Sequence, residues 1–302
     1  MTARFSIVVL AHNVADYLDD ALSSIRAQTF REFDVLAVDN GSPDGCGAII
    51  DRYAERDPRF RPIHLNLPLD MGPARNAGMA LATGEYLLFL DGDDSFADVS
   101  ALAAISRRLD FAAAPDVLFY DFDYRRHCGI RKRSSLLRIL PAAPRTFLLR
   151  DRPEAIRVSW TCWNKAYRKS FIERFGMSFP PGYYEDSVWS SSCLLSARSI
   201  SVLEDVCVSY RCCRPNSVTR SRSDRHSDAF EQYERIFDFL DAHPDLEFAG
   251  IRAILLDSMA GFLTALGGSR MVIPVEKRDD FRRRARRYVD SRRRLPTSPC
   301  PD

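Results

Sequence analysis

Short apolar runs alternate with helix-like stretches through the first third of the chain. Between two such runs, Leu18, Leu22 and Ile25 recur at the spacing of one helix face. Strands that alternate with helices in this way are typical of a parallel sheet. The pattern predicts an α/β fold with a mostly parallel central sheet flanked by helices, and its strands are expected at 5–10, 33–38, 61–65, 85–90 and 116–122.

A helix is also expected between residues 71 and 84, just before the fourth of these strands. Pro73 suits the first helical position and Gly84 suits the stop. Arg75 and Asn76 would then lie in the first turn, where a helix presents unpaired N–H groups and a partial positive charge. Such a terminus favours a bound phosphate.

The character of the chain changes after about residue 225, where strand patterns give way to amphipathic helices. We expect a first domain over residues 1–222 and a small helical region over residues 223–302. The apolar stretch 249–268 is interrupted by Arg252 and Asp257, which favours an amphipathic helix over a membrane span. The C-terminal region is therefore expected to be a helical accessory to the sheet.

Positive charge is concentrated near the C-terminus, although the formal net charge of the whole chain is only +2. Residues 281–294 hold eight arginines and one aspartate. This tail could contact phosphates, an acidic polymer or anionic lipid, or form a solvated helix face. Nucleic acid is not expected as a partner, because only Tyr288 is interleaved with the arginines. The ending LPTSPCPD, at 295–302, suits a linker to a further domain.

Composition places the chain among soluble globular proteins, with 46% hydrophobic and 28% charged residues. Its eight cysteines show neither a CxxC pair nor histidines at zinc spacing, so reduced thiols in the cytosol are expected. The chain contains no GxGxxG, GxxxxGK or GxSxG motif. Dinucleotide-dependent, P-loop and α/β-hydrolase chemistry are therefore not expected.

Three carboxylates, Asp91, Asp93 and Asp94, directly follow the fourth predicted strand. In an open α/β sheet, ligands bind beyond the carboxyl ends of the strands, where Asn13 and Asp39 would also lie. Carboxylates on a short loop suit a hard divalent cation, which could in turn bridge a diphosphate. A polar turn that closes a buried strand is the alternative.

Two further sets of polar residues are candidates for chemistry. Glu185 and Asp186 precede a helical stretch, so either could cap that helix or accept a proton from a substrate hydroxyl. Arg211 and Arg214, at the end of a strand pattern, are either a solvated pair or a phosphate contact. Nearby aromatic residues could stack on a substrate or pack in the core: Trp160, Trp163, Tyr183, Tyr184 and Trp189.

Taken in order, these motifs resemble the family 2 glycosyltransferases, which have the GT-A fold. The likeness rests on FSIVVLAHNVADYLDDALSSIRAQTFREFDVLAVDNGSPDG, GPARNAGMALATGEYLLFLDGDD, WNKAYR and YYEDSVWS, and covers about residues 4–220. The resemblance implies a GT-A domain that binds a nucleotide-sugar donor, with a UDP-sugar expected. It also implies Mn²⁺ or Mg²⁺ as the metal cofactor.

The resemblance assigns roles on the donor side. Asn13 and Asp39 would line the pocket for the base and ribose of the nucleotide-sugar. Arg75 would reach the base or its phosphates. Asp91 and Asp93 match the metal-binding DxD pair of the family, with Asp93 as the direct ligand of the ion.

The resemblance also assigns roles on the acceptor side. Asp186 matches the catalytic base, with Glu185 as its neighbour, and Trp163 and Lys165 resemble an acceptor-side WxK motif. Once Asp186 deprotonates the acceptor hydroxyl, that oxygen would displace the nucleoside diphosphate with inversion of the anomeric carbon. A closing loop that contacts the diphosphate would comprise Arg211, Arg214 and Ser217.

Three positions depart from the patterns of this family. His12 and Asn40 stand where the family usually has Tyr and Asp, which bears on how the base is held. The sequence QYERI at Gln232 lacks the final Trp of the QxxRW motif that processive members carry. Transfer of a single sugar is therefore expected.

The order of segments is also similar to the N-terminal glycosyltransferase part of bacterial bifunctional enzymes that join it to a CDP-glycerol glycerophosphotransferase. This likeness implies a cell-wall polymer, teichoic-acid-like or other glycan, as the acceptor. It further implies a cytoplasmic protein that contacts the inner face of the membrane through the basic tail. A non-catalytic module that binds a nucleotide-sugar or polymer on the same fold is the alternative.

Overall fold

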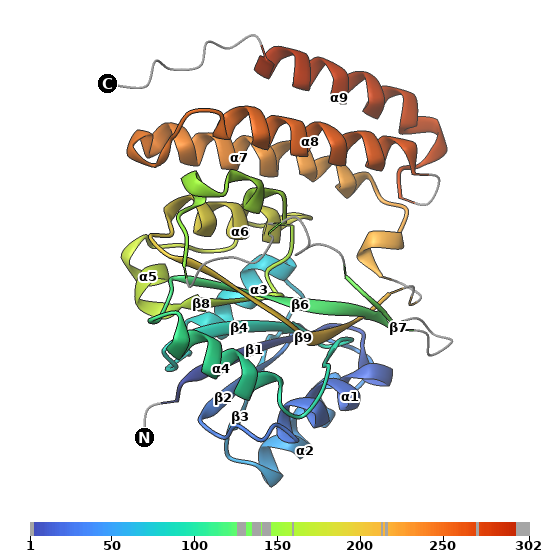
Figure 1. Cartoon of the computed structure of the whole chain (residues 1–302). Helices are drawn as coiled ribbons and strands as arrows, with labels where there is room; N and C mark the ends of the chain where they lie inside the picture. The colour runs from blue at the N-terminus through green and yellow to red at the C-terminus, as the bar shows by residue number, and fades with distance from the viewer. Residues whose placement is uncertain are drawn as a thin grey trace.

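A nine-stranded mixed sheet lies at the centre of the part of the chain that the structure describes (Figure 1). This computed structural model describes residues 3–125, 131–134, 140, 146–158, 160–212, 214, 217–269 and 272–293. The strand order is β3-β2-β1-β4-β8-β6-β9-β5, and β7 pairs with β6. The α/β prediction is therefore confirmed.

The first half of the sheet is parallel throughout. Every residue of β1 is buried, which explains its unbroken apolar sequence. The strands of this half are β1 (Phe5–Ala11), β2 (Phe33–Asp39), β3 (Phe60–His64) and β4 (Tyr86–Asp91), and their helices are α1 (Ala15–Arg26), α2 (Cys46–Arg56) and α3 (Met71–Met79). Strand register pairs Ala11 with Asp39 and Leu10 with Asp91, so the carboxyl ends of β1, β2 and β4 meet at one edge.

The second half of the sheet is mixed. Strand β8 runs antiparallel to both β4 and β6, whereas β9 runs parallel to β6, with a register shift beside Asp121. Its strands are β5 (Ser95–Phe96), β6 (Val117–Arg125), β7 (Arg131–Arg133), β8 (Lys165–Arg168) and β9 (Ile200–Arg211), and its helices are α4 (Ala101–Phe111), α5 (Lys169–Arg174) and α6 (Glu185–Ser196). Short 3₁₀ turns, η2 (Leu149–Asp151) and η3 (Pro153–Val158), precede β8.

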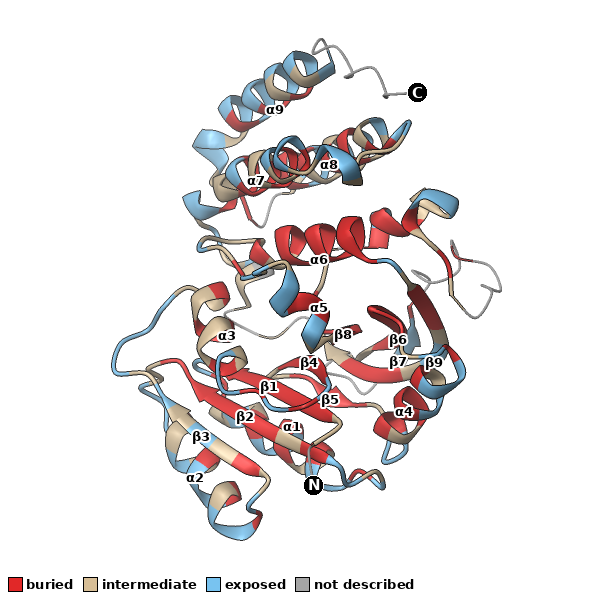
Figure 2. Ribbon diagram, turned by 90° about the vertical axis from the view of Figure 1, so that its left-hand side faces the viewer, coloured by how far each residue is buried: buried red, intermediate tan, exposed pale blue. Residues whose placement is uncertain are grey.

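Three C-terminal helices lie beyond α6 on the side away from the sheet: α7 (Asp228–Ala242) and α8 (Ile251–Gly268) form a layer next to α6, and α9 (Arg278–Arg293) packs on the far side of that layer (Figures 1 and 2). The short turns η4 (Val218–Arg220) and η5 (Asp224–Ser227) precede α7, whereas η6 (Pro244–Leu246) lies between α7 and α8 and η7 (Val275–Lys277) between α8 and α9. Figure 2 shows α6 buried along nearly its whole length between the sheet and this layer. Helices thus follow the sheet in the last part of the described chain, and the division into two domains at residue 222 stays a prediction. The predicted linker at 295–302 lies outside the described residues.

Among the described helices, α8 is long and apolar enough to cross a membrane by length and composition alone. It packs against α7, α9 and the turn η3. Its inward face is formed by Ile251, Leu255, Met259 and Leu263. The exposed positions between them include Asp257, so α8 has the amphipathic character that the sequence predicts.

Two helix starts differ from the sequence-based predictions. Helix α3 begins at Met71, two residues before Pro73, and ends at Met79. The prediction that Arg75 lies in the first turn is therefore wrong, because it lies in the second. Helix α6 begins at Glu185 without a side-chain cap, so the interpretation of Glu185 or Asp186 as its cap is also wrong.

Gly84 allows the turn before β4 to lie against the start of β1. A Cβ atom on Gly84 would fall 2.5 Å from the Ser6 backbone nitrogen and 2.6 Å from the Phe5 carbonyl carbon. These are main-chain atoms of a buried strand, so they cannot move aside as a flexible side chain would.

We therefore expect Gly84→Ala to lower the free energy of unfolding by about 1–3 kcal/mol, the usual cost of overpacking. Gly261→Ala in α8 is the control, because no atom lies within 4 Å of its added Cβ. That helical substitution should be neutral or stabilise by up to about 1 kcal/mol. Denaturant unfolding of both variants tests the difference, and equal effects would contradict it.

Candidate active site

Polar residues from β1 and β2 form one end of the candidate site. The Asp39 carboxylate accepts a hydrogen bond from the Ser42 backbone N–H at 3.0 Å. Its other oxygen lies 3.6 Å from His64 Nδ1 and 2.8 Å from where a Cβ on Gly47 would lie. Gly47 is thus needed to leave room for this carboxylate. Sequence reasoning missed His64, although its position at the end of the neighbouring strand is a usable signal.

His12 and Asn13 form a short chain of hydrogen bonds beside Asp39. His12 Nδ1 lies 2.9 Å from the Asn40 carbonyl oxygen, which can only accept, so Nδ1 carries the hydrogen. His12 Nε2 then accepts from Asn13 Nδ2 at 3.1 Å in the neutral ring. Asn13 adopts a left-handed backbone conformation with φ of 53°.

Asn40 does not take part in this exposed chain through its side chain. Its amide donates to the Leu69 carbonyl and accepts from the Leu69 N–H, each at 2.8 Å. Asn40 is 2% exposed. It therefore fastens the loop between β3 and α3 to the end of β2, which keeps that loop beside Asp39.

The acidic loop comprises Asp91, at the end of β4, and the following Asp93 and Asp94. Its carboxylates lie close together, and not every carboxylate oxygen has a hydrogen-bond partner among the described residues. Asp93 forms an ion pair with Arg214. Asp94 is 1% exposed, and one of its oxygens accepts the Arg211 N–H at 2.7 Å. Its other oxygen, Oδ2, is buried and has no hydrogen-bond partner among the described residues. Burial raises the pKa of both Asp93 and Asp94, and the charge of Asp91 adds to the rise in each.

These carboxylates fit a hard divalent cation by chemistry, since oxygen ligands and excess negative charge favour one. Within the described ranges, no three His, Cys, Asp or Glu residues converge as a ready-made metal site. Mg²⁺ is commonly held by one or two carboxylates together with substrate phosphates. Asp91 and Asp93 are therefore suited to hold an ion that a phosphate ligand helps to bind.

Arg211 contacts protein groups rather than open space. Its side chain donates to the Asp93 carbonyl at 2.9 Å and to Asp20 at 2.7 Å, and its guanidinium lies 4.8 Å from the centre of the Tyr17 ring. Arg211 thereby ties the acidic loop to α1. Its role as a phosphate contact, and that of Arg214 beside Asp93, stay predictions.

Arg75 joins the acidic loop to the start of α6. Its guanidinium, in a side chain only 4% exposed, donates to Asp91 at 2.8 Å and forms a second ion pair with Glu185. Glu185 is 1% exposed, and its second oxygen has no partner in the described part of the chain. Burial raises the pKa of Glu185, and the positive charge of Arg75 opposes that rise.

Helix α3 also holds the segment that leads into α6. The Asn76 amide donates to the Phe179 carbonyl at 2.8 Å and accepts the Phe179 N–H at 2.9 Å. A Cβ on Gly72 would lie 2.2 Å from the Pro180 carbonyl oxygen. Arg75 and Asn76, which the sequence analysis placed at a phosphate-binding helix terminus, therefore fix the backbone ahead of Asp186 together with Gly72.

Asp186 differs from Asp91, Asp93 and Glu185 because its carboxylate forms no ion pair with the described residues. It is partly exposed, and it makes no hydrogen bond or ion pair with the described residues. Burial and the charge of Glu185 raise the pKa of Asp186 to about 8, against the opposing effect of the positive charge of Arg75. A carboxyl with such a pKa is mostly protonated at neutral pH, and its ionised form, which is populated toward pH 8 and above, is a stronger base than an ordinary aspartate.

Lys165 and the nearby tryptophans are inside the protein. Lys165 is fully buried, its Nζ donates to Asn164 Oδ1 at 2.6 Å, and burial lowers its pKa to about 7. Trp163 stacks on Tyr210 with ring centres 5.2 Å apart, and Trp189 stacks on Phe179 at 4.2 Å. Trp163 and Trp189 thus pack in the core, which was one of the two interpretations of these aromatic residues.

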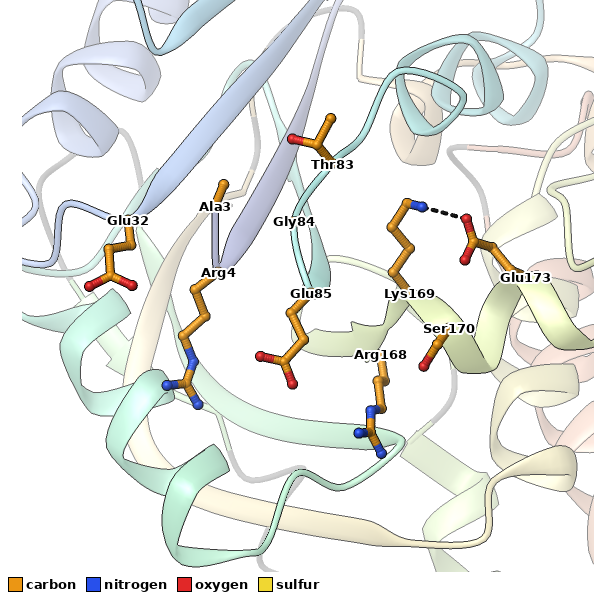
Figure 3. A pocket seen from close by; sticks show the side chains of 10 residues that line it. All are labelled: Ala3, Arg4, Glu32, Thr83, Gly84, Glu85, Arg168, Lys169, Ser170 and Glu173. Atoms are coloured by element: carbon orange, nitrogen blue, oxygen red, sulfur yellow. Dashed lines mark hydrogen bonds and ion pairs between the residues drawn. The ribbon is translucent and has the colours of Figure 1, made fainter. Parts of the chain in front are cut away.

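A hollow of about 470 Å³ lies at the opposite, amino-terminal ends of β1 and β4 (Figure 3). Positive and negative side chains occur in equal number in its lining, and Lys169 and Glu173 form an ion pair with each other. The charged side chains are Arg4, Glu32, Glu85, Arg168, Lys169 and Glu173. This hollow contains none of the candidate site residues.

The sequence of this chain is similar to that of a known protein family and of individual proteins. The model of glycosyl transferase family 2 matches residues 6–175. The uncharacterized glycosyltransferase EpsJ of Bacillus subtilis is 30% identical over 227 residues, which make up 72% of this chain. The chain spans 64% of the length of EpsJ.

Two solved structures have a similar fold. S. aureus TarS 1–349, in complex with UDP-GlcNAc, matches with a TM-score of 0.66 and 20% identity over 96% of this chain and 89% of TarS 1–349. The mannosyltransferase PcManGT of Pyrobaculum calidifontis, in complex with GDP-Man and Mn²⁺, matches with a TM-score of 0.53 and 17% identity over 97% and 86%. The expected GT-A fold is thereby confirmed.

The raised pKa of Asp186 makes stability depend on pH. In the unfolded chain this carboxyl ionises near pH 4, whereas in the folded protein it keeps its proton up to about pH 8. The folded state therefore binds more protons across this window, so the contribution of Asp186 to stability falls as the pH rises.

We expect the stability advantage of Asp186→Asn over the unmodified protein to grow between about pH 4 and pH 8 and to level off above. An advantage of about 2 kcal/mol is expected at pH 8, less than the full pKa displacement implies because the side chain is partly exposed. Thermal unfolding across this pH range measures it, with exposed Asp245→Asn as the control. A pH-independent difference would contradict the raised pKa.

Proposed function

The chain belongs to glycosyl transferase family 2, and on that premise we propose that it transfers a single sugar from a nucleotide-sugar to an acceptor hydroxyl. The observation that carries this proposal is the Asp186 carboxylate. It is partly exposed and unpaired among the described residues, and it stands beside the acidic loop that follows β4. A proton acceptor and a candidate metal site therefore share one edge of the sheet.

On the donor side, Asn13 and Asp39 would hold the base and ribose, with a UDP-sugar as the expected donor. The UDP-GlcNAc complex of TarS and the GDP-Man complex of PcManGT support a nucleotide-sugar without fixing the base. Arg75 has a side chain only 4% exposed, and two of its nitrogens are already committed to Asp91 and Glu185. We therefore assign Arg75 to positioning rather than to direct recognition of the donor.

Asp91 and Asp93 would hold Mn²⁺ or Mg²⁺. Such an ion supplies positive charge that stabilises a departing diphosphate. The raised pKa of Asp93, caused by burial and by the charge of Asp91, supports a cation there. Arg214, already paired with Asp93, would add a second positive charge on the diphosphate side.

On the acceptor side, Asp186 would accept the proton of the attacking hydroxyl. That oxygen would bond to the anomeric carbon as the bond to the diphosphate breaks on the opposite face, which inverts the configuration. Glu185 is held by Arg75 and is almost fully buried, so it would orient Asp186 rather than take the proton.

A panel of donors tests this proposal. UDP-, GDP-, CDP- and dTDP-sugars are compared by thermal shift and by donor hydrolysis, with Mn²⁺, with Mg²⁺ and with chelator. We expect metal-dependent stabilisation by one donor class, lost in Asp93→Ala, and slow hydrolysis that falls about 10²–10⁴-fold in Asp186→Asn. Asp245→Asn is the control and should behave as the unmodified protein.

Each outcome of the panel has a distinct meaning. Binding that survives in Asp186→Asn, with no turnover by any form of the protein on any acceptor, would favour a non-catalytic binding module. No binding of any nucleotide-sugar would refute the proposal as a whole.

We further propose that the acceptor is a cell-wall polymer, teichoic-acid-like or another glycan, and that the protein works in the cytoplasm against the inner face of the membrane. Helix α9 supports the membrane contact. Its buried face is formed by Phe281, Ala285 and Val289. On its exposed face, Arg286 and Arg287 make no ion pair with the described residues. Exposed arginines of this kind favour an anionic lipid surface.

Binding to vesicles tests the role of α9. We expect the protein to sediment with phosphatidylglycerol vesicles at about 0.05 M salt and much less at about 0.5 M salt, because salt screens exposed charges. Arg286→Glu/Arg287→Glu should weaken binding about tenfold or more. Arg52→Glu/Arg56→Glu changes the same charge on the exposed face of α2 and should have a smaller effect. Equal losses in both variants would contradict a docking face on α9.

A further inference from the structure

The helical C-terminal layer holds the loop that carries the proposed base. Four polar contacts reach consecutive residues of this loop from outside it. They are Gln232 to the Pro181 carbonyl at 2.8 Å, the Gly182 N–H to Asp70 at 2.9 Å, the Tyr183 N–H to Asp228 at 3.0 Å, and the Tyr184 hydroxyl to His226 at 2.5 Å. Asp228 and Gln232 belong to α7, and His226 lies in the turn that precedes it.

Tyr184 is the strained member of this loop. Its φ of 68° places it in the left-handed region, which residues other than glycine rarely adopt. It immediately precedes Glu185 and Asp186 at the start of α6. Any relaxation of Tyr184 toward an ordinary backbone conformation would therefore turn the first residues of α6 and displace the Asp186 carboxylate.

His226 is placed to prevent that relaxation. Its ring is fully buried, and Nε2 lies 2.7 Å from the Ser221 carbonyl oxygen. Since a carbonyl can only accept, Nε2 carries the hydrogen of the neutral ring, and Nδ1 is left to accept from the Tyr184 hydroxyl. Phe262 of α8 packs edge-on against the Tyr184 ring at 5.0 Å, which confines it further.

We propose that His226 is a positioning residue for the transfer reaction, acting through the Tyr184 hydroxyl to hold Asp186 in place. This inference rests on the proposed function of Asp186. Helix α3 holds the same start of α6 from the other side, through the ion pair of Arg75 with Glu185. The base is thus fixed between two elements that are distant in sequence, and the helical layer supplies one of them.

Tyr184→Phe tests the proposal because it removes only the hydroxyl. We expect turnover of the sugar donor to fall about tenfold or more, since small displacements of a catalytic group are costly. The KM for the donor should stay within about twofold, because Asn13, Asp39 and the acidic loop are untouched. Tyr233→Phe is the matched control, as it removes a buried hydroxyl of the same helical layer that has no partner among the described residues.

Amide hydrogen exchange gives a second measurement that does not depend on activity. Tyr184→Phe should speed exchange in peptides that cover residues 180–188, whereas Tyr233→Phe should not. Unchanged exchange in Tyr184→Phe would overturn the positioning role even if no donor were turned over. Faster exchange with turnover unchanged would also overturn it, whereas an inactive unmodified protein would count against the proposed function alone.

Discussion

The buried guanidinium of Arg75 is the interaction on which the geometry of the candidate site depends. It pairs with Asp91 at the end of β4 and with Glu185 at the start of α6, two groups that lie far apart in the sequence. Charges buried in this way are costly to desolvate, and removing one partner typically costs about 3–5 kcal/mol because the other charge is left unpaired. The pairing therefore forces β4 and α6 into one arrangement, and with them the proposed metal ligands and the proposed base.

Beyond Arg75, negative charge is in excess at this edge of the sheet. Burial raises the pKa values of Asp93 and Asp94, and so does repulsion from Asp91 and, for Asp94, from Asp93. Asp94 also keeps one buried oxygen unpartnered among the described residues. Arg214 compensates only part of this charge. Such a site is poorly satisfied by the protein alone, and a cation with a bound diphosphate would complete it. Under the proposed function, binding of that ligand would offset the cost to folding.

Sequence reasoning succeeded where local pattern decides structure. The buried runs of β1, β2 and β4 were predicted because fully buried parallel strands are continuously apolar. It failed where the structure is determined by contacts between residues that are distant in the sequence. The sequence around Arg75 gives no sign that Glu185 is its partner. The contacts of Asn40 with Leu69 and of Tyr184 with His226 are equally unpredictable from local sequence. The antiparallel insertion of β8 was likewise hidden, because a four-residue strand has no periodicity to detect.

The two adjacent carboxylates at the start of α6 have different chemical roles because they make different contacts with residues distant in the sequence. Glu185 and Asp186 are nearly interchangeable in sequence terms, yet their surroundings separate them. Glu185 is enclosed and committed to Arg75, so a substrate hydroxyl cannot reach it without breaking a buried ion pair. Asp186 remains partly exposed, and the charge of Glu185 beside it helps to raise its pKa toward neutrality. The charge of the enclosed carboxylate therefore makes its neighbour a stronger base, whereas the positive charge of Arg75 acts on Asp186 in the opposite direction.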